Sequence, residues 1–371
     1  MTTVETAWRP VAPEGVQIGP AVWNGTSLVV EAAAHRGGRI YTLGAAEALV
    51  LEALREPGTV DEIADRVKES SGLAISLRSV ERIINIFLVH GLVVRPTGTV
   101  PQEAQDIDPA SQEQASSQHP SPASPPRALQ VITSCAWGVA GTRIAPVLAL
   151  LCIAVGAMVA AGVVSGWSQI TASVKGLTGL GPLGVILSVT GAVIWHLVSQ
   201  CGHEIAHGIA FVRLAGGRLP VLSVTFLGPV PMPSTRLDGL GLIRSRQRAL
   251  AIVLAGPLFT LAMAALPAGA ALLGTAGTGV AAWGSLSLLI DLTIVILSLT
   301  PFPNTDMTRG LEMLVGVKQL PLAALRARRG TPVPQGLPRL TRLAITCYPV
   351  VLLTAFLVVA AWSGLLISSL I

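Results

Sequence analysis

Residues 203–207, His-Glu-Ile-Ala-His, place two imidazoles and a carboxylate within a stretch that is otherwise apolar. On a helix, side chains four positions apart lie about 40° from each other around the axis and about 6 Å apart along it. His203 and His207 can therefore bind one metal ion, while Glu204 stands beside the ion and can take a proton from water. We expect Zn²⁺, because imidazole and carboxylate ligands suit this ion and leave a position open for water.

A catalytic zinc site needs a third protein ligand, and acidic side chains are scarce in the apolar part of the chain. From residue 128 onward they are Glu204, Asp238, Asp291, Asp306 and Glu312. Asp306 follows two prolines in the segment LTPFPNTDMTRG, where the prolines end a span. Irregular backbone at membrane depth is tolerated only against protein or a wet cavity, so Asp306 is the candidate third ligand. The alternative, a packed histidine pair beside an unrelated glutamate, is disfavoured because ionisable groups are costly in such a span.

Two further polar residues, His196 and Asp291, lie deep in apolar runs. His196 is on the same helical face as His203 but about 10 Å further along the axis, which excludes it as a ligand of the same ion. Asp291 lies at a depth that could match that of His196. The two could pair or relay protons, but two independently satisfied polar residues are the favoured interpretation.

The composition is typical of a membrane protein. Of 371 residues, 51% are hydrophobic and 12% are charged, which is far more apolar than a soluble domain. Runs long enough to cross about 30 Å of hydrocarbon lie near 144–166, 182–212, 249–274, 280–300 and 343–368. The expected fold class is mainly α: a polytopic helical membrane protein of about five spans, with an N-terminal soluble winged-helix-like α+β domain.

Lysine and arginine residues are unevenly distributed among the loops. Arginines precede the first span and lie between the second and third and between the fourth and fifth, whereas only Lys175 lies on the opposite side. The positive-inside rule therefore predicts a multi-pass protein of the cell membrane with a cytosolic N-terminus and an outside C-terminus, and we expect a bacterial inner membrane. The HEIAH motif and Asp306 both fall near cytosolic ends of spans, so they can meet at one depth.

Residues 1–96 have the pattern of a small cytosolic domain. Two β-rich pieces, TSLVVEA and GRIYTL, precede three segments with apolar residues at helical spacing, near 45–55, 60–70 and 77–90, which indicates a winged-helix-like unit. Residues 97–130 are rich in Pro, Ser and Gln and are expected to be a disordered linker. Residues 131–371 are expected to form the membrane domain.

A nucleic-acid partner is not expected. Residues 1–100 contain eleven acidic and nine basic side chains, a net charge of −2. Duplex binding by phosphate neutralisation needs a basic face, which these residues do not provide.

The HExxH helix and the later P-x-P-x-x-D segment at the end of a span together resemble the site-2 protease family of intramembrane zinc metalloproteases. The resemblance covers roughly residues 180–315. It implies His203, His207 and Asp306 as zinc ligands and Glu204 as the general base.

Three details of the membrane region bear on this resemblance. Family members often have Asn three residues before the first proline, where this chain has Ser298, and commonly Gly directly after the aspartate, where it has Met307. Ser298 and Asn304 are kept as candidate accessory residues. The segment AGPLFT, with Gly256 and its following proline, also looks like the family pattern, although a structural kink explains it as well.

Residues 218–235, RLPVLSVTFLGPVPMPST, are too short and too rich in proline to form a span. Their alternation and β-branched residues suggest a strand or hairpin on the cytosolic side. In the site-2 protease family this position resembles an edge strand beside the active site, which could pair with an extended substrate backbone. A plain connecting loop is an equal alternative.

The order of hairpin, helices and the segment TVDEIADRV over residues 22–96 resembles the PqqD-like recognition domains of ribosomally made peptide natural-product pathways. That resemblance implies that a leader peptide adds a strand to the hairpin. A plain regulatory or docking domain is the alternative.

Together these features predict an intramembrane zinc metalloprotease that acts, in the lipid bilayer, on a membrane-associated peptide or single-span protein. Removal of a leader from a precursor peptide bound through the N-terminal domain is the preferred case. Two alternatives stay open: a regulated protease that releases a membrane-tethered transcription regulator, and a non-proteolytic component of peptide export or immunity that keeps the metal as structure.

Overall fold

The structure is a computed structural model that describes most of the chain. The described residues are 9–24, 27–35, 38–94, 138, 140, 142, 144–216, 220–227, 230–237 and 239–370. They belong to two compact units, Met1–Ile18 with Val30–Val131, and Gly19–Val29 with Ile132–Ile371. The expected linker, 97–130, lies outside the described residues, so the domain boundaries near 96 and 131 stay predictions.

The first unit is a small α+β domain whose helices follow the local capping signals. Thr59 and Glu62 form a capping box at the start of α2, and Gly72 ends that helix with a φ of 70°. Apolar side chains from the sheet and from all three helices bury one another in a single core. The elements are β1 (Gln17–Ile18), β3 (Leu28–Ala33, of which Val30–Ala33 belong to this unit), β4 (Ile40–Gly44), α1 (Ala45–Ala53), α2 (Val60–Ser71) and α3 (Leu77–Val89).

The N-terminal sheet is built around β3. This strand pairs antiparallel with β1, with Ile18 opposite Ala32, and with β2 (Val22–Trp23), with Val22 opposite Val29. The strand β4 also pairs with β3. The expected arrangement of a small β-sheet followed by three helices is confirmed.

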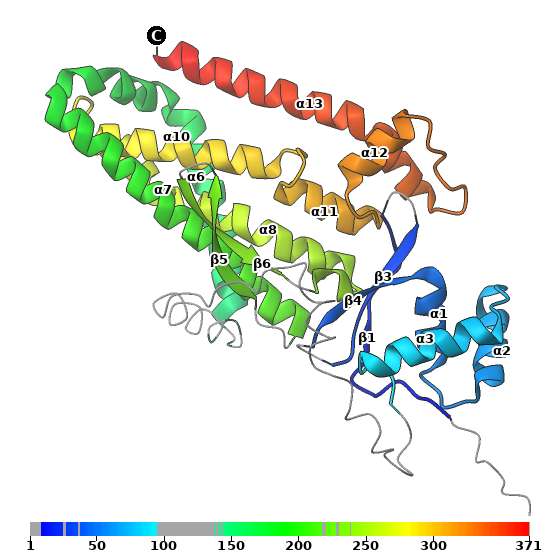
Figure 1. Ribbon diagram of the computed structural model, residues 1–371. Coiled ribbons are helices and arrows are strands. Elements are labelled where there is room, and N and C mark those ends of the chain that lie inside the picture. Colours follow the sequence, from blue (N-terminus) through cyan, green and yellow to red (C-terminus); the bar gives the residue numbers. More distant parts are fainter. Residues whose placement is uncertain are drawn as a thin grey trace, which may run out of the picture. The chain divides into compact units, whose positions relative to one another are not determined.

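The second unit is mainly helical and contains one hairpin. In Figure 1, α7 runs beside α8 and α10, and α8 runs beside α11. Its elements are α6 (Ile144–Lys175), η2 (Gly176–Leu180), α7 (Gly181–Phe211), η3 (Val212–Gly216), β5 (Val221–Leu227), β6 (Val230–Arg236), η4 (Leu240–Leu242), α8 (Arg246–Met263), α9 (Ala265–Leu273), α10 (Gly279–Leu299), α11 (Asp306–Val315), α12 (Leu320–Arg328) and α13 (Arg339–Leu370).

Four helical runs among the described residues are long and apolar enough to cross a membrane. They are Ile144–Ala215, Arg246–Leu273, Gly279–Leu299 and Arg339–Ser368. The first is 72 residues long, about three times what one crossing of roughly 30 Å requires. It contains two helices of crossing length, α6 and α7, separated by η2 and by Gly181 with a φ of 71°. The described residues thus hold four candidate runs where five spans were expected, and the first run alone contains two helices of crossing length.

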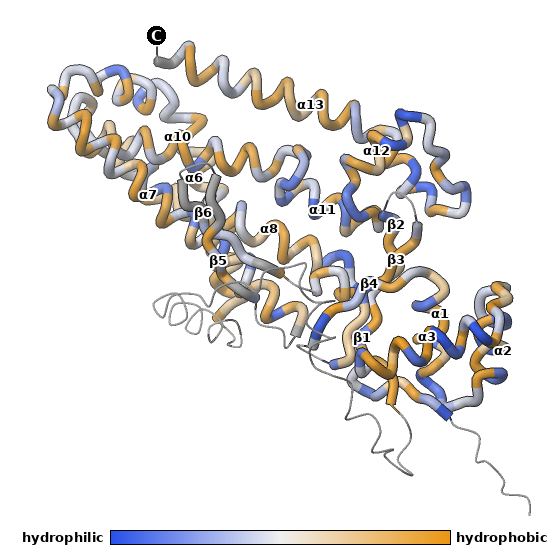
Figure 2. The backbone as a smooth tube through the Cα atoms, viewed as in Figure 1, coloured by the Kyte–Doolittle hydropathy of each residue, from blue (hydrophilic) through white to orange (hydrophobic). Residues whose placement is uncertain are grey.

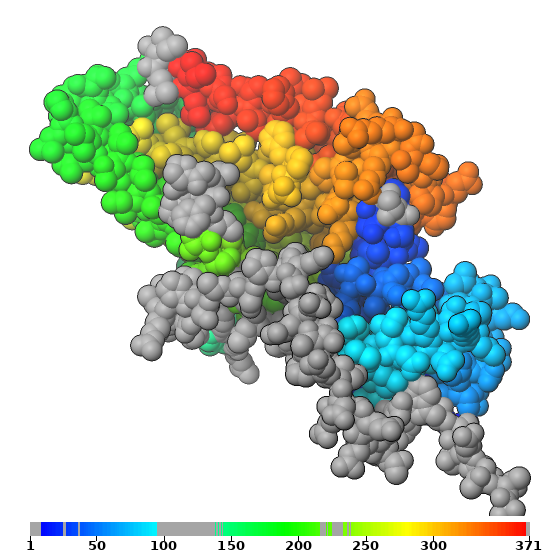
Figure 3. All heavy atoms as spheres, in the orientation of Figure 1, coloured from blue at the N-terminus to red at the C-terminus, as the bar shows by residue number. Residues whose placement is uncertain are grey.

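The apolar helices differ in how much of their surface the unit itself buries. In the runs that contain α8 and α10, 39% and 44% of the most apolar 18-residue stretch is buried inside the protein. In the first and last runs the corresponding shares are 11% and 6%. Many apolar side chains of the outer helices are consequently exposed, among them Leu187 of α7 and Phe356 of α13. Hydrophobic residues recur along both helices (Figure 2). In the space-filling view α13 lies along the surface beside α10 (Figure 3). Water does not stabilise so large an apolar surface, whereas lipid does.

Residues 19–29 contribute a buried tryptophan to the second unit. The main-chain N–H of Trp23 donates to the Gly316 carbonyl (3.0 Å), and the main-chain N–H of Lys318 donates to the Trp23 carbonyl (2.8 Å). Trp23 therefore pairs in parallel with Val317. The side chain is 3% exposed and packs in a core with residues of α11, α12 and α13. The sequence does not predict that this segment belongs with the membrane helices.

Replacing Trp23 tests this packing. We expect Trp23→Ala to lower the free energy of unfolding of the second unit by about 3–5 kcal/mol, because it opens a large cavity in a buried core. Trp23→Phe is the matched control and is expected to cost much less, since the buried indole N–H has no hydrogen-bond partner among the residues that the structure describes. The melting transition of the detergent-solubilised protein measures both, and equal melting temperatures for wild type and Trp23→Ala would contradict the packing role.

Candidate metal centre

The two histidines of the HEIAH motif lie on one face of α7, as their spacing predicts. The side chains of His203 and His207 are buried, at 4% and 5% exposure, and their rings lie 4.8 Å apart between centroids. Their Nε2 atoms are 3.1 Å apart. Both imidazoles therefore direct the same nitrogen into the same small space.

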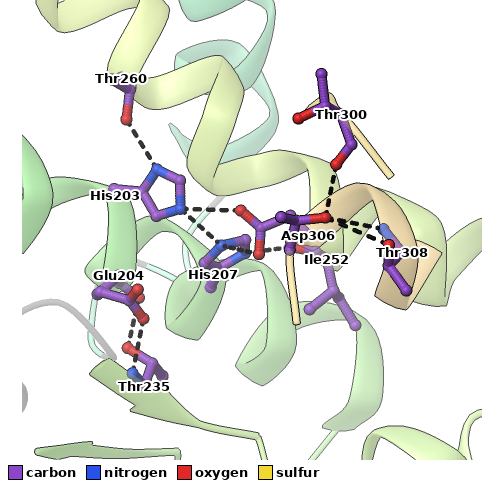
Figure 4. Close-up of polar contacts among 10 residues, drawn as sticks. His203, Glu204, His207, Thr235, Ile252, Thr260, Thr300, Asp306 and Thr308 are labelled. Carbon is purple, nitrogen blue, oxygen red and sulfur yellow. Dashed lines mark hydrogen bonds and ion pairs between the residues drawn. The ribbon is translucent and has the colours of Figure 1, made fainter. Parts of the chain in front are cut away.

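Asp306 reaches that space from the start of α11. Helix α10 ends at Leu299, and the proline-containing segment leads to α11, where the Thr305 hydroxyl caps the new helix by accepting from the Thr308 N–H. The Asp306 carboxylate lies 3.2 Å from His203 Nε2 through Oδ2 and 3.4 Å from His207 Nε2 through Oδ1. Figure 4 shows the three side chains converging. The candidate third ligand from the sequence is thus brought to the histidine pair.

The outer nitrogen of each imidazole is held by α8. His207 Nδ1 lies 2.8 Å from the Ile252 carbonyl, which can only accept, so Nδ1 carries the proton and donates. His203 Nδ1 lies 2.8 Å from the hydroxyl of Thr260, which is fully buried. With Nδ1 protonated, a neutral His207 turns the lone pair of Nε2 toward the Asp306 carboxylate. Two acceptors that face each other in a buried space need a cation between them.

Gly256 of α8 leaves the room that a bound ion would need. A Cβ atom at this position would lie 2.6 Å from His203 Nε2 and closer still to His207 Nε2. No side chain larger than hydrogen fits against the two ligand nitrogens. The three converging ligands, their bonded outer atoms and this space together fit a divalent metal ion.

The electrostatic environment keeps Asp306 ionised. Burial by itself raises the pKa of this carboxyl group, but when His203 and His207 are protonated their Nε2–H groups and positive charges favour the carboxylate, and this effect outweighs burial and holds the pKa well below its usual range. An ionised carboxylate beside two imidazoles is the form that ligates a metal.

Glu204 follows His203 in the chain, but its carboxylate is hydrogen-bonded to Thr235 and not to the three converging side chains. Its Oε2 atom accepts a hydrogen bond of 2.6 Å from the Thr235 N–H, and its main-chain carbonyl accepts one of 2.8 Å from the Thr235 hydroxyl. Thr235 belongs to β6, which pairs antiparallel with β5, so the described part of residues 218–235 forms the two strands of the expected hairpin. The strand β6 packs against α7, and Thr235 contacts Glu204 (Figure 4).

The four remaining candidates from the sequence lie apart from the three ligands. Asp291 is fully buried and accepts a 2.9 Å hydrogen bond from the Trp195 indole. His196 Nδ1 is buried, and no hydrogen bond reaches it within the described residues. Asn304 is exposed, has a φ of 68° and lines a separate cavity of about 320 Å³. Ser298 is half-buried near the end of α10.

The sequence does not predict Thr235 or Thr260 as parts of the site, and Gly256 stands out in it only within the segment AGPLFT. Gly256 and Thr260 are four positions apart in AGPLFT, so they share a face of α8. That spacing is the signal that could have found them. The role of Ile252 comes from its main-chain carbonyl, which has no signature in the sequence.

Comparisons of the chain with protein-family models, with curated proteins and with solved structures find no match. The function is therefore inferred from the site itself.

Filling the space beside the ligands tests the metal centre. We expect Gly256→Ala to abolish binding of a stoichiometric divalent metal, because the added Cβ collides with both ligand nitrogens. Gly269→Ala is the matched control, since a Cβ at that helical glycine has nothing within 4 Å. Metal analysis of the purified, folded proteins measures the effect, and full metal content in Gly256→Ala would rule out this location for the ion.

The bond to the outer nitrogen of His203 gives a second test. We expect Thr260→Val to weaken metal affinity by roughly 10–100-fold, because the ring loses the partner that orients it. Thr260→Ser keeps the hydroxyl and is expected to stay near wild type. Competition against a chelator of known affinity measures the difference, and equal affinity in Thr260→Val and wild type would show that this bond does not orient the ligand.

Proposed function

We propose that this chain is a multi-pass membrane zinc metalloprotease that hydrolyses a peptide bond in a membrane-associated peptide or protein. The observation that carries the proposal is the convergence of His203, His207 and Asp306 in a buried space, with the carboxylate of Glu204 on the adjacent position of the same helix. Two imidazoles and one carboxylate are a ligand set of catalytic rather than structural zinc, because a structural site is closed by a fourth protein ligand.

The division of labour follows from the residue types. Bound Zn²⁺ supplies a Lewis acid that polarises water and the scissile carbonyl. Glu204 takes a proton from the attacking water and later delivers it to the leaving nitrogen, as the C–N bond breaks and the water oxygen stays on the new carboxyl group. His203, His207 and Asp306 hold the ion, and Thr260 and the Ile252 carbonyl orient the two rings.

The apolar outer helices support residence in a bilayer, and the loop arginines support a cytosolic N-terminus and an outside C-terminus, in a bacterial inner membrane. With that orientation the site lies toward the cytosolic side. The hairpin of β5 and β6 beside Glu204 supports a substrate that binds in extended form.

We further propose that the first unit binds the substrate, preferably the leader of a ribosomally made precursor peptide. Among the described strands β4 pairs only with β3, so its other edge is available to an additional strand. Helix α3 exposes three large apolar side chains, Leu77 at 49%, Ile86 at 41% and Val89 at 66%, which suit a peptide with apolar side chains.

Co-expression with small peptides encoded nearby tests the proposal. We expect wild type to shorten a precursor peptide and Glu204→Ala to leave it intact while keeping its metal, because the general base is lost and the ligands are not. Mass spectrometry of the peptides and metal analysis of the protein measure the two outcomes.

The same experiment separates the alternatives. Unchanged peptide masses in both strains would count against leader removal and favour a regulated protease with a single-span substrate. Intact biological function in Glu204→Ala, together with unfolding of His203→Ala, would show that the metal is structural and that the chain is a non-proteolytic export or immunity component.

A further inference from the structure

The prolines of β6 show which way its backbone groups point. In an antiparallel pair, successive residues of a strand direct their N–H groups alternately toward the partner strand and away from it. Pro231 and Pro233, which have no N–H, lie opposite Phe226 and Val224 of β5, and Thr235 two positions on lies opposite Leu222. The Thr235 N–H donates to Glu204 and not to β5. Positions 231, 233 and 235 therefore share the edge of β6 that faces away from β5.

This edge of β6 has a single donor. Two of its three outward positions are proline, so Thr235 is the one residue of Val230–Arg236 that has an outward N–H to give. That N–H is used on Oε2 of Glu204, at 2.6 Å. The remaining groups of the edge, the carbonyls of Pro231 and Pro233, can only accept.

Thr235 makes a second bond to the same residue. Its hydroxyl donates to the Glu204 main-chain carbonyl at 2.8 Å, and its side chain is 8% exposed. One bond holds the carboxylate and the other holds the helix backbone beneath it, so the strand and α7 are joined at the position next to a ligand histidine (Figure 4).

We propose that Thr235 is a positioning residue for Glu204. By occupying Oε2 it fixes the rotamer of the carboxylate and leaves Oε1 to take the proton from water, and a charge-assisted hydrogen bond is strong enough to hold that geometry. The inference rests on the proposed function, in which Glu204 works beside a bound metal. A loss of positioning by Thr235 can be distinguished from a failure of the proposed function, because metal binding and probe binding are measured separately.

The chain itself offers matched variants. Thr235→Pro removes both the N–H and the hydroxyl, so its difference from Thr235→Val isolates the N–H bond. It is compatible with the β5–β6 ladder, because positions 231 and 233 of the same parity are already proline. Thr235→Val removes only the hydroxyl, and Thr235→Ser keeps both donors. Ser234→Ala removes a neighbouring hydroxyl that bonds Ser223 inside the hairpin and has no contact with Glu204.

The probe is acetohydroxamic acid, which gives up its N–OH proton to a neighbouring base and chelates a metal through its two oxygens as acetohydroxamate. The full-length protein in detergent is loaded with Co²⁺ in place of zinc, and the visible absorption of the ion is followed as the probe is added. The dissociation constant of the probe reports how well Glu204 is placed, and its measurement needs no peptide substrate. Glu204→Ala gives the affinity that remains when the base is absent.

We expect Thr235→Pro to weaken acetohydroxamate binding by about tenfold and Thr235→Val by less, while Thr235→Ser and Ser234→Ala stay within about twofold of wild type. Co²⁺ content is expected to be the same in all variants. Wild-type affinity in Thr235→Pro, or an equal loss in Ser234→Ala, would overturn the positioning role while leaving the proposed function intact. Failure of wild type to bind Co²⁺ at all would overturn both.

Discussion

The close approach of two imidazole rings and a carboxylate inside a bundle of apolar helices is the interaction on which the rest of this structure depends. The Nε2 atoms of His203 and His207 and the Asp306 carboxylate lie within 3.1–3.4 Å of one another, in a space that is nearly closed to solvent. Removed from water and left without a counter-charge, such groups would strongly destabilise the fold. A divalent cation would turn the same arrangement into a stabilising one, and that would account for ionisable side chains in this place.

Helix α8 orients the two imidazole rings and leaves space beside them, although none of the three converging side chains belongs to it. Its residues at 252, 256 and 260 are spaced by four, so they follow one face of the helix toward α7. The carbonyl of the first bonds one ring, the hydroxyl of the last bonds the other, and the glycine between them leaves the space for the ion. This face explains why α8 is packed against both α7 and α11, the two helices that bear ligands.

Helix α11 has to present Asp306 at a fixed place, and it is held at both ends. At its start the Thr305 hydroxyl caps the helix, and the Tyr348 hydroxyl of α13 donates to the Pro301 carbonyl in the preceding turn. At its end Gly316, with a φ of 70°, turns the chain into the short pairing with Trp23. A segment far away in sequence thereby stabilises the helix that carries the third ligand.

The parts of the site that depend on local geometry can be predicted from the sequence. The i, i+4 spacing of HEIAH places both imidazoles on one helical face, and the scarcity of acids in apolar runs singles out Asp306. Capping signals and apolar spacing likewise predict the helices of the first unit, because they act within a few residues. Tertiary structure alone decided which groups hold the outer ring nitrogens, that Thr235 bonds Glu204, that Asp291 bonds Trp195, and that Trp23 packs with α11. These contacts join residues far apart in sequence through carbonyls, hydroxyls and ring edges that many other residues also have, so only the packed fold selects among them.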